Sequence, residues 1–238
     1  MRNPFEAFKT YVLEEQEIPL DGIIASRARA LEAMIQGYEK LLEEEVKEVV
    51  WLARSSTIAR AYAVAEAHAQ SIDYDAEDIE EFCFELDKGD QISYLVSGPS
   101  GLYLSALCNC AREQEISLQL GELERTIHLL GYRLPEGKRL VIEGEMGDFF
   151  GVNMEGGELL VEGSVRNWTG AGMKQGKIVV SRNVGHHTGE WMTGGEIWIG
   201  GRVGGLGDIK DGKIYEQSRL RYPPADQHPA SSSGKYEM

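Results

Sequence analysis

The sequence lacks any long hydrophobic run, since no stretch of eighteen consecutive apolar residues occurs in its 238 residues. A membrane-spanning helix needs about 20 such residues, so we expect no transmembrane segment. The charged residues spread through positions 1–17 argue against a signal peptide. Cysteine is also scarce, with residues at Cys83, Cys108 and Cys110 alone. An odd number without framework spacing argues against a disulfide-stapled fold and predicts reduced thiols in a cytoplasmic protein.

Basic charge is in short supply as well, because 24 Lys and Arg face 39 Asp and Glu, for a net charge of −15. Without a basic patch the chain has little to attract a phosphate backbone or an anionic membrane, so we expect neither nucleic acid nor membrane as a partner. Residues 1–136 hold 26 acidic and 12 basic residues, whereas residues 137–238 hold 13 and 12. Glycine is distributed the other way, with 20 of 28 between Gly137 and Gly212. The two parts therefore predict two domains.

Residues 1–135 are predicted to form an acidic, mainly helical domain with a small α/β element. A long amphipathic helix is expected from Asp21, because apolar residues recur three and four apart at Ile24, Ala28, Leu31, Ile35, Tyr38, Leu42, Val46 and Val49. Two more helices are expected, from Ser55 or Ser56 to about Gln70 and from Asp75 to Leu86. In the α/β element, strands at 91–96 and 115–120 flank a helix at 102–112. The loop 97–101 lacks the Gly-Lys-Ser/Thr ending of a phosphate-binding loop, so a plain turn is favoured.

A repeat dominates residues 136–216. Its anchor positions are nineteen residues apart and then seventeen, at Lys138, Gly157, Gly176, Gly195 and Gly212. Each anchor opens a similar phrase, such as Gly157-ELLVE-Gly163 and Gly176-KIVVS-Arg182. A fixed period of this length is typical of a solenoid, in which residues one period apart lie above each other on successive coils. The sequence thus predicts an α+β protein with a short right-handed parallel β-helix, the hand following from the rule for parallel crossovers. Residues 217–238 are predicted to be a flexible tail.

The columns of the repeat agree with this stacking. Two and four residues after the anchors stand branched or leucine side chains, which we expect to face inward: Leu140, Leu159, Ile178, Ile197 and Ile214, and Ile142, Val161, Val180 and Ile199. Two further inward columns are Met146, Val165, Val184 and Val203, and Met154, Met173, Met192 and Ile209. Directly after the anchors the charge alternates in sign, at Arg139, Glu158, Lys177, Glu196 and Lys213. Opposite charges on neighbouring parallel strands favour the same register.

These phrases resemble a known family. The pattern Gly144-EM-Gly147-DFF-Gly151 and, less completely, Arg182-NV-Gly185-HHT-Gly189 is similar to the G-x-x-G-x-x-x-G repeat of the GXGXG domain. That domain forms the C-terminal β-helix of the glutamate synthase large subunit, and it makes up much of one of the subunits of formylmethanofuran dehydrogenase. In both relatives the β-helix is a scaffold for other, catalytic domains. The resemblance covers about residues 137–216 and departs from the pattern at Arg166 and Arg182.

Two sets of side chains are candidate functional residues. Asp148, Asn167 and His186 form a polar column, a possible recognition edge for a small ligand, whereas the neighbouring column of Phe149, Trp168, His187 and Leu206 predicts a stack in which a neutral imidazole packs. Between the inward columns lies an outward apolar stripe, which needs a cover from the helical domain or from another subunit: Val141, Leu160, Val179, Trp198 and Tyr215. No residue is predicted to be catalytic or to bind a cofactor or a metal.

The sequence therefore predicts a non-catalytic structural or assembly subunit. The resemblance implies a glutamate synthase-like or formylmethanofuran dehydrogenase-like complex, with other protein subunits as partners. One alternative is a free-standing homo-oligomer that binds a small ligand, with its own copy as the partner. A hydrolase is a third interpretation, with little support because no G-x-S-x-G motif occurs.

Overall fold

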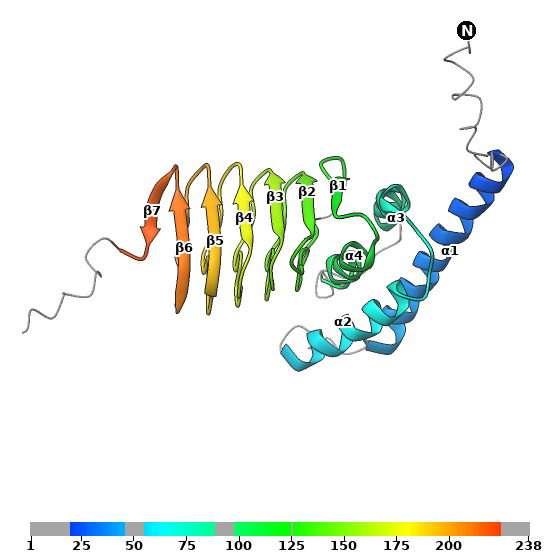
Figure 1. Cartoon of the computed structure of the whole chain (residues 1–238), viewed down its shortest axis with the longest axis horizontal. Helices are drawn as coiled ribbons and strands as arrows, with labels where there is room; N and C mark the ends of the chain where they lie inside the picture. The colour runs from blue at the N-terminus through cyan, green and yellow to red at the C-terminus, as the bar shows by residue number, and fades with distance from the viewer. Residues whose placement is uncertain (1–19, 46–54, 89–97, 125, 225–238) are drawn as a thin grey trace, which may run out of the picture.

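The computed structural model describes residues 20–45, 55–88, 98–124 and 126–224. Within this part of the chain, four helices gather at one end of a long sheet (Figure 1): α1 (Leu20–Glu45), α2 (Ser55–Ala69), α3 (Ala76–Lys88) and α4 (Pro99–Cys110). The strands are β1 (Glu115–Gln119), β2 (Arg139–Glu143), β3 (Glu158–Glu162), β4 (Lys177–Val180), β5 (Thr193–Ile199), β6 (Asp211–Glu216) and β7 (Arg219–Tyr222). They form one sheet in sequence order, parallel from β1 to β6. The helical part and the solenoid are thus both present. The strand expected at 91–96 lies outside the described residues.

The nineteen-residue stacking is confirmed by the pairing of the strands. Leu140 pairs with Leu159, Leu159 with Ile178, and Ile178 with Ile197, each one period apart. Side chains of both inward columns are buried, and the methionine column is buried with them. On a second side of the coil, single parallel bridges join Met146 to Val165 and continue through Val184 to Val203. The right-handed sense of the coil stays a prediction.

Glycine is required at one corner of each coil, as Gly151 illustrates. Its φ is +67°, and a Cβ there would lie 2.6 Å from Cδ1 of Ile178 on β4. Real carbon atoms do not approach so closely, and a residue with a Cβ is also disfavoured in this backbone conformation. The equivalent Gly170 has the same φ and packs against Ile197. The glycine column is therefore set by the branched side chains that fill the neighbouring coil.

The solenoid begins earlier than the repeat indicates. β1, expected within a small α/β element, pairs in parallel with β2, so that Ile116 lies beside Leu140 and Leu118 beside Ile142. The offset is 24 residues instead of nineteen, which hides this coil from a search at fixed period. The corner of this first coil nevertheless has the same backbone conformation as the corners of later coils. Leu129, Gly131 and Arg133 have positive φ at alternate positions, as Phe149, Gly151 and Asn153 do in the next coil.

The helix α4 closes the open end of this first coil. Ser105 Oγ donates to the carbonyl of Leu129 at 3.1 Å and accepts from the backbone N–H of Tyr132. Asn109 donates to the Tyr132 carbonyl at 3.0 Å. A Cβ at Gly101 would lie 1.8 Å from the carbonyl oxygen of His128, so glycine is needed for this close approach. Pro99, Gly101 and Leu102 in the first turn of α4 are buried.

The centre of the buried face of α1 is shifted from its apolar pattern. Ala30, Met34 and Leu41 are buried, whereas Ile24 is 58% exposed and Leu31 and Ile35 are half-buried. The predicted apolar residues Leu31, Ile35, Tyr38 and Leu42 still pack against the core from the edge of this face. Val46 and Val49 lie outside the described residues. The cause lies at Gly37, where a Cβ would lie 2.2 Å from His68 and 2.5 Å from the hydroxyl of Tyr103. Because Gly37 has no side chain, this part of α1 packs directly against the hydrogen-bonded pair of His68 and Tyr103.

The other end of the solenoid is formed by β7. A two-residue turn at Gln217 and Ser218, both with positive φ, reverses the chain, and β7 runs antiparallel to β6. The predicted tail therefore begins with a strand. Residues 225–238 lie outside the described part.

Lys138 joins the helical part to the solenoid. It occupies an anchor position that is glycine in the other repeats, and its Nζ donates to the carbonyls of Ala111 and, at 2.7 Å, Glu113 just after α4. Helix-terminal carbonyls favour a nearby cation. Desolvation by burial lowers the pKa of the Lys138 ammonium, which fits a group held among protein atoms.

We expect Lys138→Met to lower the free energy of unfolding by about 1–3 kcal/mol, because two carbonyls lose a charged donor. Lys213→Met, which removes an exposed lysine from β6, serves as the control and should change stability by less than about 1 kcal/mol. Urea denaturation followed by circular dichroism measures both. Equal effects of the two substitutions would show that Lys138 does not hold the two parts together.

Candidate interaction surface

The outward stripe lies where the sequence predicts it, on the outer face of β2–β6. Its five residues are all half-buried. At its end the rings of Trp198 and Tyr215 stack with centroids 3.9 Å apart and planes at 16°. Lys177 Nζ lies 5.7 Å from the Trp198 ring centroid, and the indole N–H donates to Glu196 at 3.0 Å. The helices gather beyond β1, at one end of the sheet, and do not lie over this aromatic end (Figure 1). The stripe is thus an apolar surface framed by charges.

A second aromatic surface follows the corner of the coils. Phe149 stacks on Trp168 at 5.0 Å between centroids, and Trp168 stacks on His187 at 4.9 Å, with planes within 9° of parallel. The predicted stack is therefore present for these three residues. Leu206 does not continue it, because the shortened last repeat brings Leu206 opposite Thr188. All three ring-bearing residues have positive φ, which costs each about 1–2 kcal/mol. The regular backbone of the corner imposes this conformation.

The side chains of the polar column form hydrogen bonds from one coil of the solenoid to the next. Asp148 Oδ1 accepts from the backbone N–H of Asn167 at 2.9 Å and from its side-chain amide at 3.0 Å. Asn167 Oδ1 in turn accepts from the backbone N–H of His186 at 2.9 Å. Each side chain thus satisfies a donor of the next coil, and these oxygen atoms are engaged. His186, at the end of the column, is exposed.

His128 extends the polar column into the first coil, although the repeat gives no sign of it. Its Nδ1 accepts from the backbone N–H of Asp148 at 3.0 Å, so this nitrogen carries no proton. Burial lowers the pKa of His128 below its ordinary value of 6.5, against an opposing effect of the Asp148 carboxylate. The imidazole is therefore a neutral structural acceptor. The offset of 20 residues between His128 and Asp148 removes it from the nineteen-residue register.

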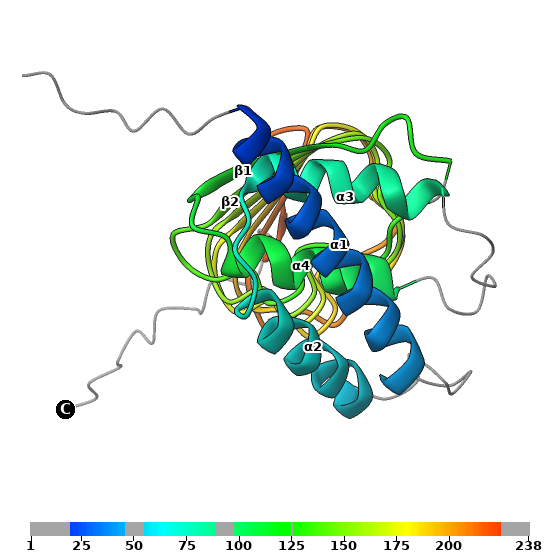
Figure 2. The same ribbon diagram turned by 90° about the vertical axis from the view of Figure 1, so that its right-hand side faces the viewer.

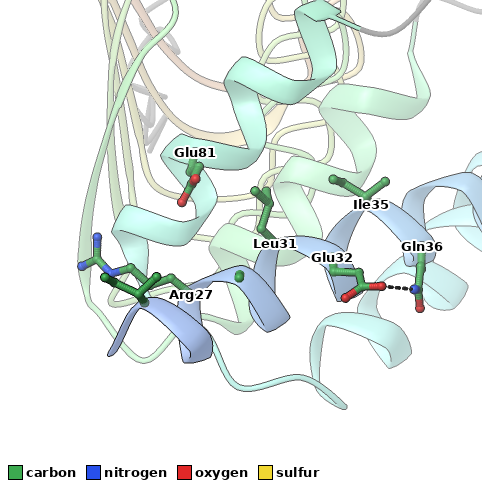
Figure 3. A pocket seen from close by; sticks show the side chains of 8 residues that line it. Arg27, Leu31, Glu32, Ile35, Gln36 and Glu81 are labelled. Carbon is green, nitrogen blue, oxygen red and sulfur yellow. Dashed lines mark hydrogen bonds between the residues drawn. The ribbon is translucent and has the colours of Figure 1, made fainter. Parts of the chain in front are cut away.

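Two hollows lie outside the surfaces that the sequence predicts. The junction cleft, of about 280 Å³, lies between α2, the end of α4 and the corners of two coils. In it Glu155 binds Arg133 at 3.2 Å and Lys174 at 3.0 Å, and Cys110 presents a half-buried thiol whose pKa is raised by burial. The second hollow, the α1 groove, of about 580 Å³, runs along α1 beside α3 (Figure 3). Its lining combines four apolar residues of α1 with the polar side chains of Arg27, Glu32, Gln36 and Glu81.

No described arrangement points to a metal or redox centre. Among residues 20–45, 55–88, 98–124 and 126–224, no three His, Cys, Asp or Glu side chains are grouped to hold a metal ion. Cys83 and Cys108 are buried free thiols, and burial raises the pKa of Cys108 to about 12. None of the helices in the described ranges combines the length and apolar character that crossing a membrane requires.

Comparison with known proteins finds no match among protein families, curated proteins or solved structures. The resemblance to the GXGXG domain stays a prediction based on the motif.

We expect the stability of the protein to fall as the pH drops from 7.5 to 5.5, in part through His128. The pKa of His128 is lower in the folded state than in the unfolded state. Below about pH 6.5 the unfolded state therefore binds more protons than the folded state, and the free energy of unfolding falls. His68 contributes in the same direction, because burial lowers its pKa too.

His128→Asn tests this contribution, since the asparagine oxygen can replace Nδ1 as an acceptor but does not titrate. Urea denaturation at both pH values should show a smaller loss for the variant than for the parent chain. An identical pH dependence of the two proteins would assign the effect to other groups.

Proposed function

We propose that this chain is a non-catalytic structural or assembly subunit of a larger protein complex. The resemblance of its repeat to the GXGXG domain favours a glutamate synthase-like or formylmethanofuran dehydrogenase-like complex, in which a right-handed β-helix spaces the catalytic domains. The stacked coils support a spacing role, because each coil is tied to the next by backbone hydrogen bonds, inward side chains and one polar ladder.

The outward stripe is the observation that carries this proposal. The five residues are partly exposed and run side by side over several strands. Apolar surface of this kind is typical of interfaces, and aromatic residues are favoured at their centres. Here the stacked Trp198 and Tyr215 offer a rigid anchor, while Lys177 and Glu196 beside them supply the polar rim. The sheet is built from short strands of similar length, so the stripe is a regular surface against which a folded partner can pack.

A protein partner fits this surface better than the other classes. The net charge of −15 opposes binding to nucleic acid or anionic lipid. A small ligand would need a concave site. The polar column is the candidate site for such a ligand, but the side-chain oxygen atoms of Asp148 and Asn167 already accept hydrogen bonds from the backbone of the next coil. The homo-oligomeric alternative uses the same stripe with a second copy as the cover.

Purification of the chain at native abundance separates these two functions. We expect it to elute with other subunits, which mass spectrometry would identify and cofactor absorbance would classify as flavin or iron–sulfur proteins. If instead the chain elutes alone or as a homo-oligomer, the assembly function is wrong.

The double variant Trp198→Ser/Tyr215→Ser tests the surface itself. We expect it to fold but to lose most of the co-eluting protein, because the aromatic anchor of the interface is removed. Trp191→Ser is the matched control, since Trp191 is 60% exposed and lies outside the stripe. If the double variant keeps its circular dichroism spectrum and still elutes with the same proteins, the outward stripe is not the interface.

A further inference from the structure

The outer face of the sheet carries one pair of like charges. Glu143 of β2 lies directly beside Glu162 of β3, and both side chains are exposed. In the column that follows the anchors, by contrast, every neighbouring pair is of opposite sign, as with Arg139 beside Glu158. Like charges placed opposite each other on neighbouring strands are destabilising. Neither carboxylate forms an ion pair within the part of the chain that the structure describes, so this pair is left without a cation there.

These two carboxylates lie beside the outward stripe. The outward-facing positions along β2 are Arg139, Val141 and Glu143, because the residues between them are buried. On β3 the same order of charged, apolar and charged side chains recurs, with Leu160 in the middle. The apolar surface is therefore a single residue wide on each of these strands, with charge on both sides.

A surface of this width fits a helix better than a sheet. Two packed sheets bury several residues of each strand, whereas an amphipathic helix presents one narrow apolar stripe. A helix that runs along the solenoid axis rises about 5.4 Å per turn, and neighbouring strands lie about 4.8 Å apart, so its turns keep nearly in step with the strands. None of the described helices of this chain takes that place, because they lie across the open end of the coils (Figure 2).

We propose that the outward stripe binds an amphipathic helix of a partner subunit whose lysine or arginine side chains reach Glu143 and Glu162. Apolar side chains of this helix, one turn apart, lie on Val141, Leu160 and Val179. Basic side chains on one flank of the helix, also one turn apart, each meet one of the two carboxylates. These lie two residues along the strand from the stripe, at a distance of about 6.6 Å, which is within reach of a long basic side chain.

The opposite flank of the stripe is already neutralised within the chain. Arg139 pairs with Glu115 at 3.0 Å, and Lys213 pairs with Glu196 at 3.5 Å. A helix that is basic along one flank only therefore fits in one direction, because turning it end for end would move its cations away from the free carboxylates.

This inference rests on the proposed function, because it names the kind of segment that the outward stripe binds. The net charge of −15 attracts any cationic peptide, so the test has to separate the two glutamates from the charge of the whole chain.

Two synthetic helical peptides of about 18 residues serve as probes. Both carry leucine residues one turn apart on one face, and along one flank the first has lysine where the second has glutamine. Fluorescence anisotropy of each labelled peptide, titrated with the full chain at low salt, gives the two Kd values. We expect the lysine peptide to bind about ten times more tightly, because it gains two ion pairs.

Glu143→Gln/Glu162→Gln should remove most of this preference. The matched control is Glu39→Gln/Glu43→Gln, which takes the same charge from two exposed glutamates one turn apart on α1, beyond the end of the sheet (Figure 1). The control should keep the ratio of the two Kd values within a factor of about three. Trp198→Ser/Tyr215→Ser should weaken the binding of both peptides, because their leucine side chains lose the aromatic end of the stripe.

The proposal is overturned if neither peptide binds at submillimolar concentration of the chain, if both bind equally, or if Glu143→Gln/Glu162→Gln keeps the preference. Peptide binding that is insensitive to Trp198→Ser/Tyr215→Ser also overturns it, because the peptides then lie elsewhere.

These outcomes are distinct from those that test the assembly function. If Trp198→Ser/Tyr215→Ser releases a co-eluting subunit but the peptides show no preference, the assembly function stands and the basic helix is wrong. If the peptides bind as expected but no subunit co-elutes, the helix-binding surface stands and the assembly function is wrong.

Discussion

The structure depends on the stacking of one coil on the next at a fixed step in the chain. Parallel pairing places each residue of a strand beside the residue one period later, so the inward positions become columns of apolar side chains and the first position becomes a column of alternating charge. The inward columns remove branched and methionine side chains from water. The backbone donors at the corners find acceptors on the adjoining coil, for example Gly170 N–H on the Phe150 carbonyl at 2.8 Å. Glycine is favoured at the corner, because its φ is positive and isoleucine side chains such as that of Ile178 lie where a Cβ would be.

The ends are the weak points of any such stack, because the first and last coils have no neighbour on one side. This chain closes the first coil with α4, whose Ser105 and Asn109 bond the backbone at Leu129 and Tyr132. Lys138 adds a charged contact from the solenoid to the end of the same helix. The helices α1, α2 and α3 surround α4, and one continuous hydrophobic core runs from them into the coils. The other end is formed by β7, a short strand that carries two arginines.

Function is therefore to be sought on the outer surfaces. The inward columns are filled, and the polar column engages its oxygen atoms with successive coils. The outward stripe and the α1 groove are exposed at separate places on the molecule, one along the sheet and one on the helical cap.

The sequence by itself determined the solenoid, because a period of nineteen brings the inward columns into one register in which every member is a branched, leucine or methionine side chain. It also placed the outward stripe and the three-ring stack, since alternation along a strand fixes which side chains point out. Only the tertiary structure decided at which residue the first coil of the solenoid begins. The step from β1 to β2 is 24 residues and that from His128 to Asp148 is 20, so neither matches the period of nineteen, and no local sequence pattern marks either. The rotation of α1 was likewise decided by packing. Its apolar residues extend over more of the helix surface than one contact can cover, and the missing side chain at Gly37 selects the edge that meets His68 and Tyr103. The predicted apolar residues Leu31, Ile35, Tyr38 and Leu42 therefore pack at the edge of the buried face and not at its centre.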